Sequence, residues 1–230
     1  MTDSAGRLRR SQLLYAVQFY ARDSAGRAAV PVEWMRRARS EAPGLWPFLE
    51  RHRSEADRVM ALVALREDAL ALNRFVAAMV LANFGNRDST WTALAEALRD
   101  PNPGVREAAE AVLANLPKRR VDWTPAVGTL RIILGGTNVG AMESVFDLLA
   151  RTEIDPAHAS TLLGGNGHWV LAHLRAENLP SHLAARRLLV ALNGGGDRRS
   201  TAAWRAWIDS LPAPTRARAP IRQFPRGVAP

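Results

Sequence analysis

Apolar residues recur along most of the chain at the three- and four-residue spacing of a helix that buries one face. The clearest segment, residues 100–116, has this spacing at Val105, Ala108, Ala109, Val112, Leu113 and Leu116. The spacing predicts a helix with one buried side. A shorter pattern precedes it over residues 91–98, with Asp88 or Ser89 as the expected N-cap. The Pro-Asn-Pro sequence between the two patterns predicts a turn joining antiparallel helices.

The same face returns at intervals of 32 to 40 residues. Residues 73–84 align with 105–116 at an offset of 32, and further apolar faces follow over 142–149 and 183–192. Helices are therefore predicted to end near residues 84, 116, 152 and 192. Because one helix pair cannot bury its apolar face without a neighbouring pair, periods of about 30 to 47 residues predict an all-α solenoid of antiparallel helix pairs.

The string from Leu98 to Leu116 resembles a HEAT repeat. In that family an aspartate between the helices and an arginine on the second helix bond across the turn and stack between repeats. Asp100 and Arg106 match these two positions, so the resemblance implies that they form a structural pair. HEAT proteins are mostly scaffolds and adaptors, and a few relatives are lyases or DNA glycosylases. The resemblance thus implies partner binding.

Three regions are predicted from these patterns. Residues 1–66 contain helical patterns without a clean repeat, at 8–21, 31–40, 45–52 and 54–66, and are interpreted as an irregular N-terminal cap. HEAT-like repeats are expected over 67–211, closed by a capping helix packed on the 180–193 helix through Trp204, Trp207, Ile208 and Leu211. Residues 212–230 contain five prolines, which predicts a disordered tail.

The net charge of +9 favours an acidic partner such as nucleic acid, because clustered positive charge attracts polyanions. Only one of the 31 basic residues is a lysine, a skew that is more typical of GC-rich coding than of a binding device. The tail contributes four of the positive charges. The candidate basic contacts are Arg36, Arg37, Arg39, Arg216, Arg218, Arg222 and Arg226, with a further cluster at Arg7, Arg9 and Arg10.

The glycine-rich segment 130–140 could be taken for a phosphate-binding loop after a strand. A Walker A loop would need Lys and then Ser or Thr after Gly140, where Ala141 and Met142 stand. The segment is better explained by a helix that ends at Gly135, followed by a helix that begins at Thr137 or Asn138.

No other pattern has the spacing of a catalytic or metal site. The chain has no cysteine, and its histidines are scattered over positions 52, 158, 168, 173 and 182. The carboxylates Glu107, Glu110, Glu143 and Asp147 are expected on solvent-exposed helix faces, with Arg106 pairing with Glu110. We therefore expect no catalytic residue, no metal and no cofactor.

The function predicted from the sequence is a non-catalytic scaffold that binds a protein partner. The alternative is a nucleic-acid-binding module, such as one similar to the DNA-glycosylase HEAT proteins, that uses the basic surface. Polar residues interrupt every apolar run before the roughly 18 residues that a membrane span needs, and residues 1–20 lack the pattern of a signal peptide. A cytoplasmic location is the corresponding expectation.

Overall fold

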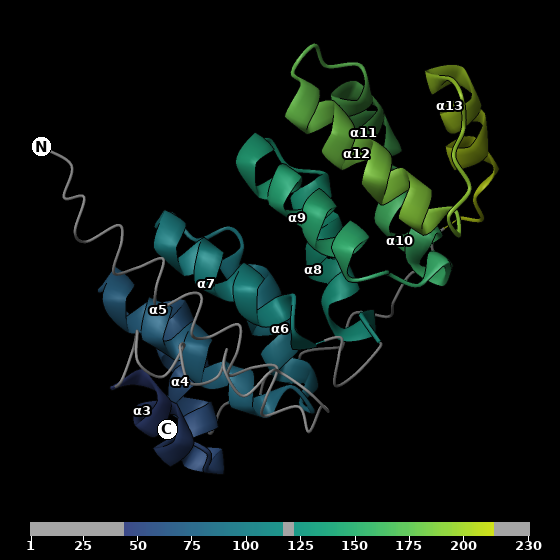
Figure 1. Ribbon diagram of the computed structural model, residues 1–230. Coiled ribbons are helices and arrows are strands. Elements are labelled where there is room, and N and C mark those ends of the chain that lie inside the picture. The colour runs from purple at the N-terminus through teal and green to yellow at the C-terminus, as the bar shows by residue number, and fades with distance from the viewer. Residues whose placement is uncertain (1–43, 117–121, 214–230) are drawn as a thin grey trace, which may run out of the picture.

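The computed structural model describes residues 44–116 and 122–213, and within these ranges it contains helices and no strand (Figure 1). This confirms the prediction of an all-α chain for the described residues. The α-helices are α3 (Leu45–Arg51), α4 (Glu55–Glu67), α5 (Ala71–Val80), α6 (Asp88–Ala97), α7 (Pro103–Leu113), α8 (Thr124–Leu134), α9 (Val139–Arg151), α10 (Ala159–Leu163), α11 (Gly167–Leu174), α12 (Leu179–Leu192) and α13 (Thr201–Ser210). Two 3-10 helices, η1 (Leu81–Phe84) and η3 (Pro156–His158), complete the set.

Successive helices pack as pairs, and alternate helices contact one another in two layers. The pairs are α4 with α5, α6 with α7, α8 with α9, and α11 with α12. In one layer α4 contacts α6, α6 contacts α8 and α8 contacts α10, while in the other α5 contacts α7 and α9 contacts α12. This second layer thus consists of α5, α7, α9 and α12, and within it α7 and α9 pack less closely than the other neighbours (Figure 1).

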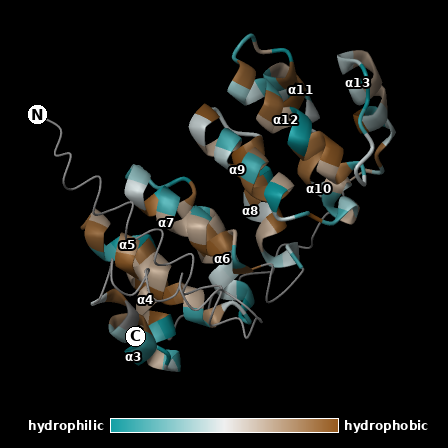
Figure 2. Cartoon of the chain, in the orientation of Figure 1, coloured by the Kyte–Doolittle hydropathy of each residue, from teal (hydrophilic) through white to brown (hydrophobic). Residues whose placement is uncertain are grey.

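The core runs between the two layers, where the apolar sides of the helices face one another (Figure 2). Two of its largest side chains meet between α6 and the N-cap of α8, where the rings of Trp91 and Trp123 lie edge to face with centroids 5.1 Å apart. Both rings are fully buried, and the Trp91 Nε1–H donates to the carbonyl of Gly85. Aromatic pairs of this geometry add to the stabilisation from burial, so this contact anchors the first layer.

The helix boundaries follow local sequence signals. Asn102 caps α7 by accepting the N–H of Gly104, and Asn138 caps α9 by accepting the N–H of Ala141. The helix α8 ends at Leu134 with Gly135 at its C-cap, which confirms the helical interpretation of the glycine-rich segment. The start of α6 differs from the prediction: Arg87 is the N-cap and Asp88 lies in the first turn, where its charge favours the positive end of the helix dipole.

The last described helix, α13, packs chiefly against α11, whereas the sequence led us to expect packing on the 180–193 helix. Gly167 permits this approach, because a Cβ at that position would stand 2.5 Å from a methyl carbon of Ile208. The guanidinium of Arg198 lies over the rings of Trp204 and Trp207, at 5.8 and 5.6 Å from their centroids. Within the described ranges, none of the helices is both long and apolar enough to cross a membrane.

Candidate functional site

A charged cluster at the helix turns joins the first two helix pairs. The carboxylate of Asp100 accepts the N–H of Asn102 at 2.8 Å, which fixes the turn between α6 and α7. Two nitrogens of Arg74, on α5 of the preceding pair, bind the same carboxylate at 2.7 and 3.0 Å. The side chains of Arg74 and Asp100 are only 13% and 7% exposed, so this ion pair is largely shielded from water.

The cluster repeats with the 32-residue period. Arg106 donates through Nη1 to the carbonyl oxygens of Asp100 and Pro101, at 2.7 and 3.1 Å. One pair earlier, Arg74 donates through Nη1 to the corresponding carbonyls of Asp68 and Ala69, at 2.7 and 3.2 Å. Each arginine therefore closes its own turn, and Arg74 also reaches the aspartate of the next turn.

The Asp100 and Arg106 side chains singled out from the sequence are in this cluster, joined through the main chain of Asp100. The carboxylate of Asp100 is bound by Arg74. Within the described residues Arg106 makes no ion pair of its own, since Gly136 occupies the corresponding place in the next turn, 36 residues after Asp100. Burial alone would raise the pKa of Asp100, but the bonds from Arg74 and Asn102 and the charges of Arg74 and Arg106 hold it below its usual value.

The second half of the molecule contains a groove of about 830 Å³ that crosses the second-layer helices. It is bounded by α7, α9, the loop after α9, and α12 with the turn that follows it. Its apolar lining consists of Ala150, Ile154, Pro156, Leu183, Val190 and Ala191. Leu183 is 41% exposed, so a large apolar side chain is available to a bound molecule.

Three arginines line the groove, and each pairs with an acid. Arg151 on α9 bonds to Glu110 on α7 at 2.7 Å, between the two helices of the second layer that pack less closely. Arg187 bonds to Asp147 at 2.8 Å, and Arg186 bonds to Asp197. Asp197 lies outside the groove lining. The lining itself contains the three arginines and three acids, Glu110, Asp147 and Glu153, so its formal charges sum to zero.

The side chain of Glu110 is partly buried at the edge of this groove, at 25% exposure. Burial raises its pKa above the usual value, against the opposing charge of Arg151 and a hydrogen bond from Ser144. The sequence interpretation of Glu110 as a solvated partner of Arg106 was wrong, because the carboxylate turns toward α9 and its partner comes from the next helix pair.

A hydrogen-bonded cluster of Glu143, His173 and Ser181 is the arrangement closest to a catalytic one. The Ser181 hydroxyl donates to the Glu143 carboxylate at 2.5 Å and lies 2.7 Å from His173 Nδ1. In a catalytic triad the serine hydroxyl bonds to the histidine, and the histidine bonds to the acid. Here the serine bonds to both the histidine and the acid. Ser181 is also buried, at 3% exposure. The cluster ties α9, α11 and α12 together, and its geometry supplies no activated nucleophile.

The candidate basic contacts Arg36, Arg37, Arg39, Arg216, Arg218, Arg222 and Arg226 lie outside the described residues. Within the described ranges, no three histidine, aspartate or glutamate side chains converge as metal ligands would. Sequence reasoning missed the groove, because it depends on how far α7 stands from α9, and no local pattern reports that spacing.

Comparison with known proteins assigns no family to the chain. No protein-family model matches the chain, and none of the curated proteins does.

Proposed function

We propose that this protein is a non-catalytic scaffold whose second-layer groove binds a segment of a protein partner. The observation that carries the proposal is the combination of an apolar lining with side-chain charges that neutralise one another. A groove of this kind suits a peptide segment or helix that contributes an apolar ridge, while the paired charges can re-pair with polar groups of the partner.

The repeat supports a HEAT-like solenoid as the framework of this groove. The 32-residue offset relates two helix pairs that share both an aspartate turn and an arginine that closes it. Alternate helices also contact one another in two layers, as stacked pairs would. In such an array the second-layer helices offer a long ridged surface, and here that surface includes the groove.

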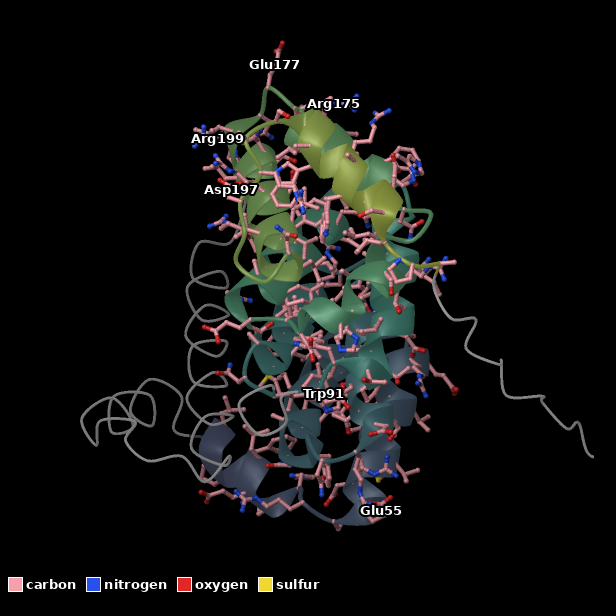
Figure 3. The ribbon with its side chains drawn as sticks, turned by 90° about the vertical axis from the view of Figure 1, so that its right-hand side faces the viewer. Glu55, Trp91, Arg175, Glu177, Asp197 and Arg199 are labelled. Atoms are coloured by element: carbon pink, nitrogen blue, oxygen red, sulfur yellow. The ribbon has the colours of Figure 1, made fainter. Side chains whose placement is uncertain are left out.

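Charge favours a protein partner over a nucleic acid for this part of the chain. The described residues include 16 arginines and 18 acids, a net charge of −2, so the positive surplus of the whole chain lies outside them. Side chains that end in oxygen and side chains that end in nitrogen are interspersed over the outside of the molecule. Glu55 lies near one end, and Arg175 and Glu177 lie near the other (Figure 3). A polyanion needs unneutralised positive charge along its path, and a glycosylase-like site would in addition place tryptophan in a basic groove. The groove lining contains no tryptophan.

Quantitative affinity capture with a groove variant and a matched surface variant tests the proposal. The groove variant is Leu183→Glu, which places a charge on the apolar lining. The control is Ile132→Glu, at an exposed position on α8 outside the groove lining. Both substitutions are at exposed positions, so circular dichroism and the melting temperature should stay close to those of the wild type.

We expect one or more proteins of the source organism to be enriched by the wild type and by Ile132→Glu, and to be depleted at least tenfold by Leu183→Glu. A purified partner should then show the same order of affinities in solution. Equal capture by all three proteins would contradict the groove as the binding surface.

A further inference from the structure

The guanidinium of Arg106 is held in the same way as that of Arg74, but it binds no carboxylate of the described residues. Nη1 of each arginine bonds to two carbonyls of its own turn, at 2.7 and 3.1 Å for Arg106 and at 2.7 and 3.2 Å for Arg74. Because the guanidinium is planar and rigid, these bonds constrain its other two nitrogens. In Arg74 those nitrogens, Nε and Nη2, reach the carboxylate of Asp100 in the next turn of the layer. We therefore expect Nε and Nη2 of Arg106 to be directed toward the turn between α8 and α9.

The turn before α9 matches the turn before α7 except for its acid. Asn102 and Asn138 are the N-caps of α7 and α9, and the side chain of each accepts an N–H from the first turn of its helix. Asp100 stands two residues before Asn102, whereas Gly136 stands two residues before Asn138. The two caps set the register of the comparison, so Gly136 occupies the place of the turn aspartate.

The other groups that surround the Asp100 carboxylate have counterparts at the turn before α9. The N–H of Asn102 donates to Asp100, and the N–H of Asn138 donates to no group of the described residues. The first turn of α9 contains no acid, so no side-chain charge of that turn neutralises the positive end of the helix dipole. Two guanidinium nitrogens, a main-chain N–H and a helix N-terminus are together suited to bind a carboxylate.

This position is next to the groove. Arg106 precedes Glu110 on α7 by four residues, which is about 6 Å along the helix axis, and Glu110 lines the edge of the groove. The helices α7 and α9 pack less closely than α5 and α7, and Arg106 is partly exposed. A segment that lies in the groove can therefore extend a side chain to Arg106.

We propose that Arg106 and the turn at Gly136 bind an aspartate or glutamate side chain of the protein segment in the groove. This inference rests on the proposed function, and it adds an acidic residue beside the apolar ridge of the partner. Charge complementarity supports the choice, because Arg151, Arg186 and Arg187 already form ion pairs with acids of this chain. Arg106 forms none with the described residues, so its charge is available to a partner.

Thermal unfolding of variants at Gly136 tests the position without any partner. The backbone there is not left-handed, and a Cβ would lie 3.3 Å from the carbonyl oxygen of Ile133, so a side chain needs only a small shift. Gly136→Asp supplies the acid from the chain itself, and Gly136→Asn has the same shape without the charge. Gly136→Asp should melt about 2 to 4 °C above Gly136→Asn. The difference should disappear when Arg106→Gln is added to both. No difference, or one that survives Arg106→Gln, would overturn the proposal.

Peptides selected from a random displayed library on the wild-type protein are the probe for binding. The selected peptides should contain an acidic residue beside their apolar residues, and Arg106→Gln and Gly136→Asp should each weaken binding at least tenfold. Replacing the acid of the peptide with Asn or Gln should weaken binding to the wild type and should have no further effect on Arg106→Gln. The control is Arg175→Gln, at an exposed arginine outside the groove lining, which should leave affinity unchanged.

The variants distinguish this inference from the groove proposal. Peptides that bind Arg106→Gln as tightly as the wild type but lose affinity for Leu183→Glu would overturn the inference and support the groove. Peptides that require Arg106 and their own acid but bind Leu183→Glu equally well would support the carboxylate position and contradict the groove. A selection that yields no peptide dependent on Arg106 would overturn the inference.

Discussion

The two halves of the described chain use the same helix-pair packing but join their pairs differently. Between residues 54 and 116, an ion pair shielded from water connects one turn to the next, and the arginine donors repeat at a fixed offset. From residue 122 onward the links are of other kinds: Asn166 donates to the carbonyl of Arg131, and the ion pair of Arg187 on α12 with Asp147 on α9 is exposed to water. This second half contains most of the groove and the serine-centred cluster.

This difference leads us to expect that the regular turns of the first half contribute mainly to stability and that the less regular second half contains the binding surface. Where local sequence signals and packing agree, as at the turns of Asp68 and Asp100, the residues serve stability. Departures from such agreement are expected at functional sites. One departure is Glu153 in the groove, which has a φ of 52°, whereas Gly194 serves the equivalent position after α12 with a φ of 64°.

The largest effect should come from breaking the turn cluster of the first half. Asp100→Ala leaves Arg74 without its carboxylate in a shielded site, and loss of one partner from such a pair costs about 3 kcal/mol. For a domain of this size that is a fall of roughly 6 to 12 °C in melting temperature. Arg74→Ala should lower the melting temperature more than Arg106→Ala, since Arg106 bonds only to main-chain carbonyls.

Thermal and urea unfolding of the three variants measure this order. Arg186→Ala, in an exposed ion pair of the second half, serves as the comparison and should change stability little. Equal melting temperatures for Arg74→Ala and Arg186→Ala would show that the turn cluster is only a surface contact.

The turn cluster and the groove should also respond oppositely to acid. The pKa of Asp100 is lowered in the folded state, so its stabilisation is present above the unfolded value of about 3.9 and is lost as pH falls through the folded pKa. The pKa of Glu110 is raised by burial, so the folded state binds the proton more tightly and stability falls as pH rises above about 4.3.

Urea unfolding between pH 7 and pH 3 should therefore give opposite trends. On acidification, the stability advantage of the wild type over Asp100→Asn should shrink, and the stability of the wild type relative to Glu110→Gln should rise. Parallel trends would mean that the two carboxylates do not differ in environment as described.

The smallest effect should be a gain in stability at the groove. A side chain in the left-handed region costs about 1 kcal/mol, which glycine avoids. Glu153→Gly should therefore raise the free energy of unfolding by up to about 1 kcal/mol, reduced by the greater freedom of glycine in the unfolded chain. A loss of stability would indicate that the Glu153 side chain itself supports the loop.

Sequence alone was sufficient for the features that depend on local order. The period of apolar residues predicted helices ending near 84, 116, 152 and 192, and the corresponding helices end at Phe84, Leu113, Arg151 and Leu192. The glycine-rich segment also predicted the C-cap at Gly135 and an N-cap at Thr137 or Asn138, and the structure has Asn138. These features are set by side-chain periodicity and backbone caps, which a linear pattern contains.

The contacts that form the candidate site could not be predicted without the three-dimensional structure. Arg74 aligns with Arg106, yet only the stacking of two pairs brings it to Asp100. The pairing of Glu110 with Arg151, 41 residues later, depends on how α7 stands beside α9. The cluster around Ser181 joins side chains from three helices, and neither its serine nor its histidine belongs to a motif. Contacts between repeats are set by packing, which sequence spacing does not report.

The central claim is that the groove serves a protein partner, and nucleic-acid binding tests it most directly. Fluorescence anisotropy with labelled duplex and single-stranded DNA, at two salt concentrations, compares the full chain, a variant ending at Leu211, and Arg186→Gln with Arg187→Gln. We predict weak binding near physiological salt, with a slope of log affinity against log salt of about −3 to −4 if four phosphates are contacted. That binding should be lost with the tail and unchanged by the groove substitutions. Submicromolar affinity that the variant ending at Leu211 retains, and that the groove substitutions reduce, would contradict the claim.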